Sequence, residues 1–430
     1  MQARIQQARQ LRGEIAVPGD KSISHRALIL GAVAEGRTVV HGLSPAADCA
    51  STIRSLQALG LEIALPEKNT AVVNGKGLLG LAEPADVLDA GNSGTTTRLL
   101  AGLLAGQPFF TVVTGDDSLR SRPMDRIVKP LAQMGATILG RREGRFLPLA
   151  IRGGNLKPIR YSLPVASAQV KSCILLAGMY AEGDTVVEEL EPTRDHTERM
   201  LKAMDVPLKQ KGKHITVRGG WAPQAANIVV PGDASSAAFF LVAAATVPNS
   251  AVTVTNVGIN PTRIGFISTL KEMGAELQME NERLENGEPV ADITCRTSSL
   301  RGITLEGDII PSLVDELPII AVAATQANGA MIVRNAAELR VKESDRIDAI
   351  VTELSRLGAK IEATPDGFVV EGPTPLRGAG CQSYRDHRIA MSLAVAGLVA
   401  KGDTVVDDAE CVDISFPGFF DLLESVRRGV

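Results

Sequence analysis

The chain repeats one pattern of hydrophobic and polar positions six times: a polar cluster, an apolar run of helix length, a small residue, and then a β-branched stretch. The first copy is "DKSISHRALILGAVAEGRTVV" and the last is "YRDHRIAMSLAVAGLVAKGDTVV". The small residues after the six apolar runs are Gly36, Gly106, Gly183, Asn249, Gly329 and Gly402. Their spacing of roughly 73 residues is too long for a solenoid repeat and predicts a supersecondary unit.

Amphipathic stretches such as "STIRSLQALGLEIAL" and "DAIVTELSRLGAKIEA" predict a second helix in the repeats. Their apolar residues recur at i, i+3 and i+4, and each stretch reaches a glycine suited to a helix C-cap before a strand begins. The first helix of each repeat is instead apolar nearly all round, which predicts a helix buried on every side. The pattern therefore predicts an α/β fold built from helix, strand, helix, strand units.

The six repeats divide into two similar domains of three repeats each. The tripeptide "PGD" occurs at residues 18–20 and again within "IVVPGDASS", residues 228–236, which marks equivalent points in two halves. We expect residues 20–229 to form the domain of repeats 1–3. Residues 1–19 together with 230–430 are expected to form the domain of repeats 4–6.

The amino ends of the buried helices are candidate anion sites. Each helix starts with unpaired backbone N–H groups and about half a positive charge. If all six ends point into one cleft between the domains, that cleft binds a small polyanion, and we expect the active site there. Serine and threonine in "KSIS", "NSGTTT" and "DASS" suit both helix caps and phosphate contacts. For "GDASS", which has no cation, capping alone is the simpler interpretation.

Charged residues at several of these places exceed what capping requires. Asp20, Lys21, His25 and Arg26 crowd the first helix start, where His25 alone is interpreted as structural. Three further segments are rich in arginine, whose planar fork matches carboxylate and phosphate. They contain Arg120, Arg122 and Arg126; Arg340, Lys342, Glu343 and Arg346; and Arg194, Asp195 and His196. A solvated face with i,i+4 ion pairs is the alternative for each segment alone, but their recurrence at equivalent places favours a ligand.

Composition excludes several other classes of protein. A formal net charge of -4 and only 3% aromatic residues argue against nucleic-acid binding. The five cysteines form no CxxC pair and there is no HExxH motif, so neither a disulfide framework nor a metal site is expected. Neither a Walker A loop nor a GxGxxG helix start occurs, and no cofactor is expected. Because we find no signal peptide and no apolar window of membrane length, we expect a cytoplasmic protein without a membrane partner.

Six motifs carry a family resemblance: "PGDKSISHRALILGA", "DAGNSGTTTRLLAGLL", "RSRPMDRI", "SAQVKSCILLAG", "ELRVKESDRI" and "YRDHRIAM". Together they closely resemble the 5-enolpyruvylshikimate-3-phosphate (EPSP) synthase family over essentially the whole chain, and "SAQVK" and "RDHTE" are similar to its class II branch. The resemblance implies two domains, each of three βαβαββ repeats around buried parallel helices, which is an inside-out α/β barrel.

The activity that the resemblance implies is that of a 3-phosphoshikimate 1-carboxyvinyltransferase. Such an enzyme transfers the enolpyruvyl group of phosphoenolpyruvate to the 5-hydroxyl of shikimate 3-phosphate and releases phosphate. The reaction belongs to the shikimate pathway of chorismate and aromatic amino acid biosynthesis. Both substrates are small polyanions, as the helix ends require. We expect a monomer whose domains close around the ligands.

The motif matches imply a role for individual residues. Those implied to bind shikimate 3-phosphate are Lys21, Ser22, Arg26, Ser167, Ala168, Gln169, Arg194, Asp315 and Lys342. Those implied to bind phosphoenolpyruvate are Lys21, Asn92, Gly94, Arg122, Gln169, Arg346 and Arg388. The implied catalytic residues are Asp315, which contacts the 5-hydroxyl, and the acid–base candidates Glu343 and Lys21. The arginines would stabilise the leaving phosphate.

Two departures from the family pattern and two rival functions stay open at this point. Some members carry Ser-Ser-Gln where this chain has Ala168 in the middle, and a lysine where Ile414 stands, so part of the pocket is filled differently. Gly94 favours sensitivity to glyphosate, because a side chain there would crowd the inhibitor.

The rivals are UDP-N-acetylglucosamine enolpyruvyl transferase, whose loop cysteine has no counterpart in "GDDSLRSRPMDR", and a non-catalytic anion-binding protein.

Overall fold

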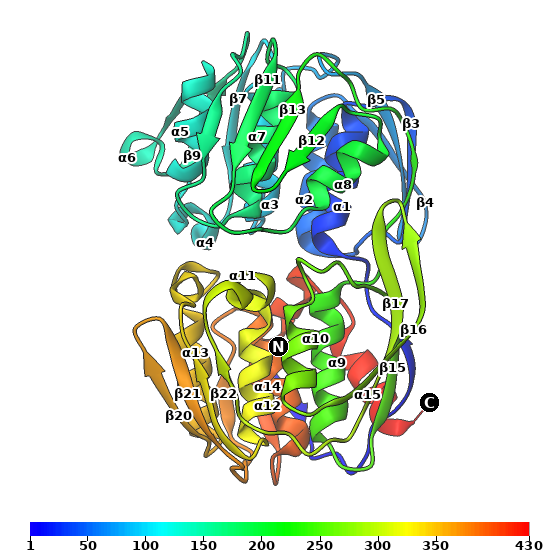
Figure 1. Ribbon diagram of the computed structural model, residues 1–430, viewed down its shortest axis with the longest axis vertical. Helices are drawn as coiled ribbons and strands as arrows, with labels where there is room; N and C mark the ends of the chain where they lie inside the picture. Colours follow the sequence, from blue (N-terminus) through cyan, green and yellow to red (C-terminus); the bar gives the residue numbers. More distant parts are fainter. Residues whose placement is uncertain (430) are drawn as a thin grey trace. The chain divides into compact units, whose positions relative to one another are not determined.

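A computed structural model describes residues 1–429, which form two compact units (Figure 1). Unit 1 contains Met1–Pro18, Pro231–Leu284 and the chain from Pro289 onward, and unit 2 contains Gly19–Val230 and Glu285–Glu288. The tip of one hairpin, Glu285–Glu288, therefore belongs to unit 2. The described helices include none with the length and apolar character that a membrane crossing requires.

Three buried helices form the centre of unit 2. They are α1 (Lys21–Ala32), α3 (Gly94–Leu104) and α7 (Ala168–Gly178). Their first turns are capped by the side chains of Asp20, Ser93 and Ser167, which accept from backbone N–H groups three residues further on. Helices α3 and α7 pack so closely that a Cβ on Gly102 would lie 2.3 Å from the carbonyl oxygen of Cys173. Such contact requires glycine at that position.

Three four-stranded sheets of unit 2 share one strand arrangement, in which a parallel pair is followed by two antiparallel strands. The sheet orders are β14-β3-β5-β4, β6-β7-β9-β8 and β10-β11-β13-β12. The strands are β3 (Glu35–His41), β4 (Glu62–Glu67), β5 (Thr70–Lys76), β6 (Leu88–Asp89), β7 (Phe110–Thr114), β8 (Thr137–Gly140), β9 (Phe146–Arg152), β10 (Arg160–Ser162), β11 (Asp184–Glu188), β12 (Leu208–Lys211), β13 (His214–Arg218) and β14 (Asn227–Val229). The second and third repeats are thus complete βαβαββ units, whereas the first takes its opening strand, β14, from the end of the third.

The second helices of unit 2 are amphipathic, as predicted, and each buries one face. They are α2 (Ala47–Ala58), α5 (Asp125–Met134) and α8 (His196–Ala203), and the shorter α4 (Asp117–Ser121) and α6 (Arg141–Gly144) lie in the second repeat. The predicted glycine C-caps are confirmed: Gly60 follows α2 with a φ of 83°, and Gly135 ends α5 with a φ of 108°.

Unit 1 has the same plan, and Figure 1 shows its three buried helices lying side by side. They are α9 (Ala234–Thr246), α12 (Leu317–Thr325) and α14 (His387–Val399). The side chains of Asp233 and Asp386 cap α9 and α14, whereas α12 has a proline in its first turn and no side-chain cap. The chain reaches α12 through short turns, η1 (Gly307–Ile309), α11 (Ile310–Leu313) and η2 (Val314–Glu316).

The sheets of unit 1 have the orders β16-β17-β15-β2, β18-β19-β21-β20 and β1-β23-β22. The strands are β1 (Ala3–Ile5), β2 (Arg12–Ala16), β15 (Ala251–Gly258), β16 (Glu276–Glu285), β17 (Glu288–Arg296), β18 (Thr304–Leu305), β19 (Gly329–Val333), β20 (Lys360–Thr364), β21 (Gly367–Gly372), β22 (Gly380–Gln382) and β23 (Thr404–Asp407). The remaining helices are α10 (Gly265–Glu272), η3 (Ala337–Val341), α13 (Arg346–Arg356), η4 (Ala409–Ile414) and α15 (Phe419–Arg428). The sixth repeat differs from the others, because β1 pairs antiparallel with β23 and completes a sheet of three strands.

Candidate active site

The first helix of unit 2 brings two cations to its amino end. The Lys21 ammonium donates to Asp48 on α2 at 2.9 Å. Arg26, one turn further along, donates to the hydroxyls of Thr197 at 2.6 Å and Ser172 at 2.8 Å, and to the carbonyl of Ser22 at 2.9 Å. Burial lowers the pKa of Arg26 to about 10, so the guanidinium is still charged at neutral pH. Both cations are thus held in fixed positions.

His25 is structural in this geometry, as the sequence suggested. Its Nδ1 lies 2.7 Å from the Thr52 hydroxyl, which in turn lies 2.7 Å from that of Thr96, so the ring joins α1, α2 and α3. Burial lowers the pKa of His25 well below its usual value, and the charges of Lys21 and Arg26 lower it further. The imidazole is therefore neutral at physiological pH.

The start of α3 presents an arginine and an amide together. Arg122 donates to the side-chain oxygen of Asn92 at 2.7 Å and to the backbone carbonyl of Asn92 at 3.2 Å. Gly94 is the first residue of α3, and a Cβ there would lie 2.8 Å from Nη1 of Arg98. Arg98 donates to Gln169 at the start of α7 at 2.5 Å. Sequence reasoning missed Arg98, because it lies inside a helix that reads as uniformly buried.

The remaining predicted residues of unit 2 lie at the starts of α7 and α8. Ser167 caps α7, and Ala168 and Gln169 are its first residues. Arg194 precedes α8 and lies close enough to Arg26 for its charge to lower the pKa of Arg26. The structure therefore brings Arg194 into the same cluster as Arg26.

Other charged residues singled out from the sequence have local partners. Arg120 donates to the carbonyl of Gly115 and to Asp117. Arg340 donates to Asp345, Asp348 and two backbone carbonyls. These two arginines fit the alternative of local ion pairing.

In unit 1, the guanidinium of Arg346 holds three carboxylates. It donates from Nε to Asp386 at 2.8 Å, from Nη2 to Glu343 at 2.5 Å and from Nη1 to Asp315 at 3.4 Å. The pKa of Arg346 is raised because these carboxylates outweigh the effect of its burial. The ammonium of Lys342 lies 3.4 Å from the same oxygen of Asp315. Two predicted substrate-binding residues, Lys342 and Arg346, thus converge on one oxygen of Asp315.

Arg388 lies in a second buried cluster of unit 1. It donates to the carbonyl of Asp315 at 2.8 Å, to Glu316 at 3.1 Å and to the Ser235 hydroxyl at 3.0 Å. Glu316 is fully buried and also accepts from Arg263 at 3.0 and 3.1 Å. Capping alone is therefore wrong for "GDASS": Asp233 caps α9, but Ser235 accepts from Arg388.

Sequence reasoning missed Glu316 as a partner of Arg388, and Arg263 as the second arginine that donates to Glu316. One signal was available, since Glu316 follows Asp315 directly and two adjacent carboxylates before an apolar helix are unusual. Across residues 1–429, no three His, Cys, Asp or Glu side chains are grouped as metal ligands would be.

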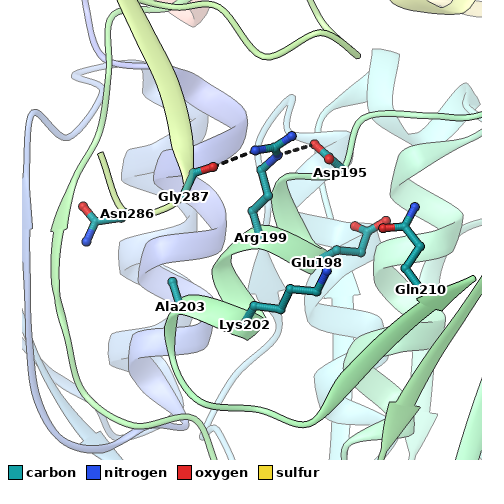
Figure 2. Close-up of a pocket in the computed structure, with 8 residues that line it drawn as sticks. All are labelled: Asp195, Glu198, Arg199, Lys202, Ala203, Gln210, Asn286 and Gly287. Carbon is teal, nitrogen blue, oxygen red and sulfur yellow. Dashed lines mark hydrogen bonds and ion pairs between the residues drawn. The ribbon is translucent and has the colours of Figure 1, made fainter. Parts of the chain in front are cut away.

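An open pocket of about 670 Å³ lies on α8 and the hairpin tip in unit 2 (Figure 2). Asp195, Glu198 and Arg199 line one wall, and Asn286 and Gly287 line the other. Arg199 donates to Asp195 on its own wall at 2.8 Å and across the pocket to the carbonyl of Gly287 at 2.6 Å. His196 Nδ1 lies 2.7 Å from a carboxylate oxygen of Glu288. The hairpin tip is therefore fastened to the start of α8, next to Arg194.

Fixed arginines beside carboxylates, at the starts of buried helices, are typical of an enzyme that binds and converts small anions. The EPSP synthase (3-phosphoshikimate 1-carboxyvinyltransferase) family model matches residues 5–423, and the chain belongs to this family.

Known relatives match this chain over nearly its full length. The chain is 52% identical over 426 residues to the 3-phosphoshikimate 1-carboxyvinyltransferase of Desulforamulus reducens, covering 99% of both chains. It is 54% identical over 427 residues to that of Pelotomaculum thermopropionicum, again covering 99% of both. An EPSP synthase structure from Acinetobacter baumannii matches with a TM-score of 0.89 and 46% identity, over 99% of this chain and 98% of the other.

These matches confirm the predicted α/β fold and the predicted activity. The chain is a transferase of the shikimate pathway, which moves the enolpyruvyl group of phosphoenolpyruvate to shikimate 3-phosphate. The UDP-N-acetylglucosamine alternative is disfavoured by the same matches.

Proposed function

We propose that the clusters at the helix starts bind the two substrates and carry out the proton transfers. Shikimate 3-phosphate is bound by Lys21, Ser22, Arg26, Ser167, Ala168, Gln169, Arg194, Asp315 and Lys342. Phosphoenolpyruvate is bound by Lys21, Asn92, Gly94, Arg122, Gln169, Arg346 and Arg388. Asp315, Glu343 and Lys21 are the catalytic residues.

The observation that carries this proposal is the contact of Arg346 with both Asp315 and Glu343. A protein that only bound anions would gain nothing from carboxylates beside its cations, because they repel the ligand. A transferase needs them. It must protonate the methylene carbon of phosphoenolpyruvate and take a proton from the attacking hydroxyl.

The reaction then runs as an addition followed by an elimination. The 5-hydroxyl oxygen bonds to C2 of phosphoenolpyruvate while a proton is added at C3, which gives a tetrahedral adduct. Loss of a proton from C3 and cleavage of the C2–O bond to phosphate restore the double bond. Asp315 orients the hydroxyl, and Glu343 and Lys21 carry the protons. Arg122, Arg346 and Arg388 stabilise the leaving phosphate.

Two isosteric variants test these catalytic roles. Glu343→Gln and Asp315→Asn keep the side-chain shape and remove the charge that each carboxylate contributes. Each is expected to lower kcat about 10²-fold or more, while the KM values change little, because general acid–base catalysis contributes on this scale. Phosphate release from phosphoenolpyruvate at saturating shikimate 3-phosphate measures kcat. A variant with near-normal kcat removes its residue from the proposed mechanism.

We also propose that the chain works as a monomer in the cytoplasm. Burial raises the pKa of all five cysteine thiols, to about 12 for Cys295, Cys381 and Cys411, as suits inert thiols in a reducing compartment. Light scattering after size-exclusion chromatography tests the oligomeric state. A mass near 45.3 kDa supports a monomer, and twice that mass contradicts it.

A further inference from the structure

Unit 2 contains a fully buried lysine that the proposed mechanism does not use. Lys171 lies in the first turns of α7 with no exposed surface. Its ammonium is 2.9 Å from Glu189 and 2.6 Å from Glu198, and it donates to the backbone carbonyl of Thr193 at 3.3 Å. Glu189 and Glu198 are buried as well. Three charges are thus enclosed together.

These contacts hold the conformation of the segment 189–198, which connects β11 to α8. Glu189 follows β11, Glu198 lies in the first turn of α8, and Thr193 lies between them. Glu189 also accepts from the backbone N–H of Thr193 at 3.0 Å and from the Thr193 hydroxyl. One ammonium therefore ties both ends and the middle of the segment 189–198. Arg194 comes directly after Thr193 in this segment.

The same layer of side chains holds Arg26. Ser172 and Thr197, which accept from Arg26, are the sequence neighbours of Lys171 and Glu198. Their hydroxyls lie 2.7 Å from each other. Arg26 and Arg194 are close enough to repel, and Glu198 offsets that repulsion, because its charge raises the pKa of Arg26. The Lys171 cluster therefore sets the position of the loop relative to Arg26.

Stability alone does not account for three buried charges. Desolvating ions is expensive, and well-packed apolar residues in place of a buried ion pair are often neutral or stabilising. A loop that must place one guanidinium accurately has a different requirement. Ion pairs and hydrogen bonds have directional geometry, which apolar packing lacks.

We propose that Lys171 is a positioning residue for shikimate 3-phosphate binding, acting on Arg194 through Glu189, Glu198 and Thr193. The inference rests on the proposed role of Arg194. The ammonium sets the conformation of the 189–198 loop, and the loop presents the Arg194 guanidinium to the anionic substrate. Lys171 itself touches neither substrate.

Two variants test the inference. Lys171→Met removes the ammonium, and the triple variant Lys171→Met/Glu189→Gln/Glu198→Gln also removes the two carboxylates that would be left buried without it. In both, KM for shikimate 3-phosphate is expected to rise about tenfold to a hundredfold, as for a displacement of about 1 Å. KM for phosphoenolpyruvate and kcat at saturating shikimate 3-phosphate are expected to stay within about threefold.

Gln107 supplies the matched control in the same unit. It is fully buried, lies just past the carboxyl end of α3, and donates to the carbonyl of Leu78 at 2.8 Å and to the Tyr180 hydroxyl at 3.0 Å. Gln107→Met should lower the melting temperature and leave both KM values unchanged. If it raises KM for shikimate 3-phosphate as the Lys171 variants do, the Lys171 effect is general destabilisation and the inference is wrong.

Arg194→Ala separates failure of this inference from failure of the proposed function. If Arg194→Ala leaves KM for shikimate 3-phosphate unchanged, the proposed role of Arg194 is wrong and the inference falls with it. If Arg194→Ala raises KM but the folded Lys171 variants do not, only the inference is overturned. In the Arg194→Ala background, Lys171→Met is expected to add no further rise in KM. Additive effects would contradict action through Arg194.

Discussion

The buried charged cluster of unit 1 should be most sensitive to a substitution at Glu316. Glu316 is fully buried, and its carboxylate is shared by Arg263 at 3.0 and 3.1 Å and by Arg388 at 3.1 Å. Glu316→Gln keeps the shape of the side chain and removes the negative charge. Two buried guanidinium groups then lose the counter-ion that they share.

The expected cost follows from this geometry. Removing one partner of a buried ion pair typically costs about 3–5 kcal/mol, because the charge left behind stays desolvated. Asp233, 3.5 Å from Arg263, compensates in part, so we expect a loss of about 3 kcal/mol in the free energy of unfolding. Because Arg388 also loses the one carboxylate among the three groups to which it donates, its guanidinium should shift, and kcat/KM for phosphoenolpyruvate should fall about tenfold or more.

Urea denaturation followed by circular dichroism measures the loss of stability, with Glu424→Gln as the control. Glu424 is also in unit 1 and pairs with Arg427 at 2.6 Å, but it lies at the surface, where such a pair contributes about 1 kcal/mol or less. The reasoning is refuted if the two variants lose the same stability, or if Glu316→Gln keeps normal kcat/KM for phosphoenolpyruvate.

Two further predictions concern unit 2. Gly94→Ala should raise KM for phosphoenolpyruvate while the fold is kept, because the new Cβ would lie 2.8 Å from Arg98 and force that guanidinium to move; an unchanged KM would contradict the proposed contact. His25 has a pKa well below its usual value in the folded state, so folding excludes a proton that the unfolded chain binds below about pH 6.5. Stability should therefore fall as the pH drops below 6.5, and His25→Gln should reduce that fall relative to the wild type; equal slopes in pH-dependent melting would count against a buried neutral ring.

The helices were the most predictable part of the fold. A run such as α9 is apolar at almost every position, which leaves a buried helix as its simplest interpretation, and Asp233 marks its start. In the amphipathic α13, apolar residues recur with the helical period of 3.6 residues, and Gly358 follows the helix with a φ of 92°. In both cases, local physical chemistry decides the structure.

The strand partners could not be predicted in the same way. Strand β14 pairs in parallel with β3, although most of unit 2 lies between them along the chain. A short strand such as Asn227–Val229 carries no local information about which distant edge it will meet. The antiparallel pairing of β1 with β23 is about twice as remote in sequence, since Ala3 pairs with Val406 and Val39 with Asn227.

The sequence shows where charge accumulates, as at Lys21, Arg26 and Arg346, and such residues are rarely buried without a partner. It does not show which partners they have. The bond from Arg98 to Gln169 spans 71 positions, and that from Arg263 to Glu316 spans 53. Single residues inside apolar or ordinary segments give no sign of such contacts until the chain is folded.

We have proposed that charged groups at the helix starts recognise the phosphate of one substrate and catalyse its reaction with the other. Phosphate release from phosphoenolpyruvate tests this claim most directly, with three co-substrates: shikimate 3-phosphate, shikimate, and UDP-N-acetylglucosamine. We predict turnover with the first, kcat/KM lower by about 10³-fold with shikimate, which lacks two or more charge-assisted hydrogen bonds, and none with the third. Equal kcat/KM with shikimate, or turnover with UDP-N-acetylglucosamine, would contradict the claim.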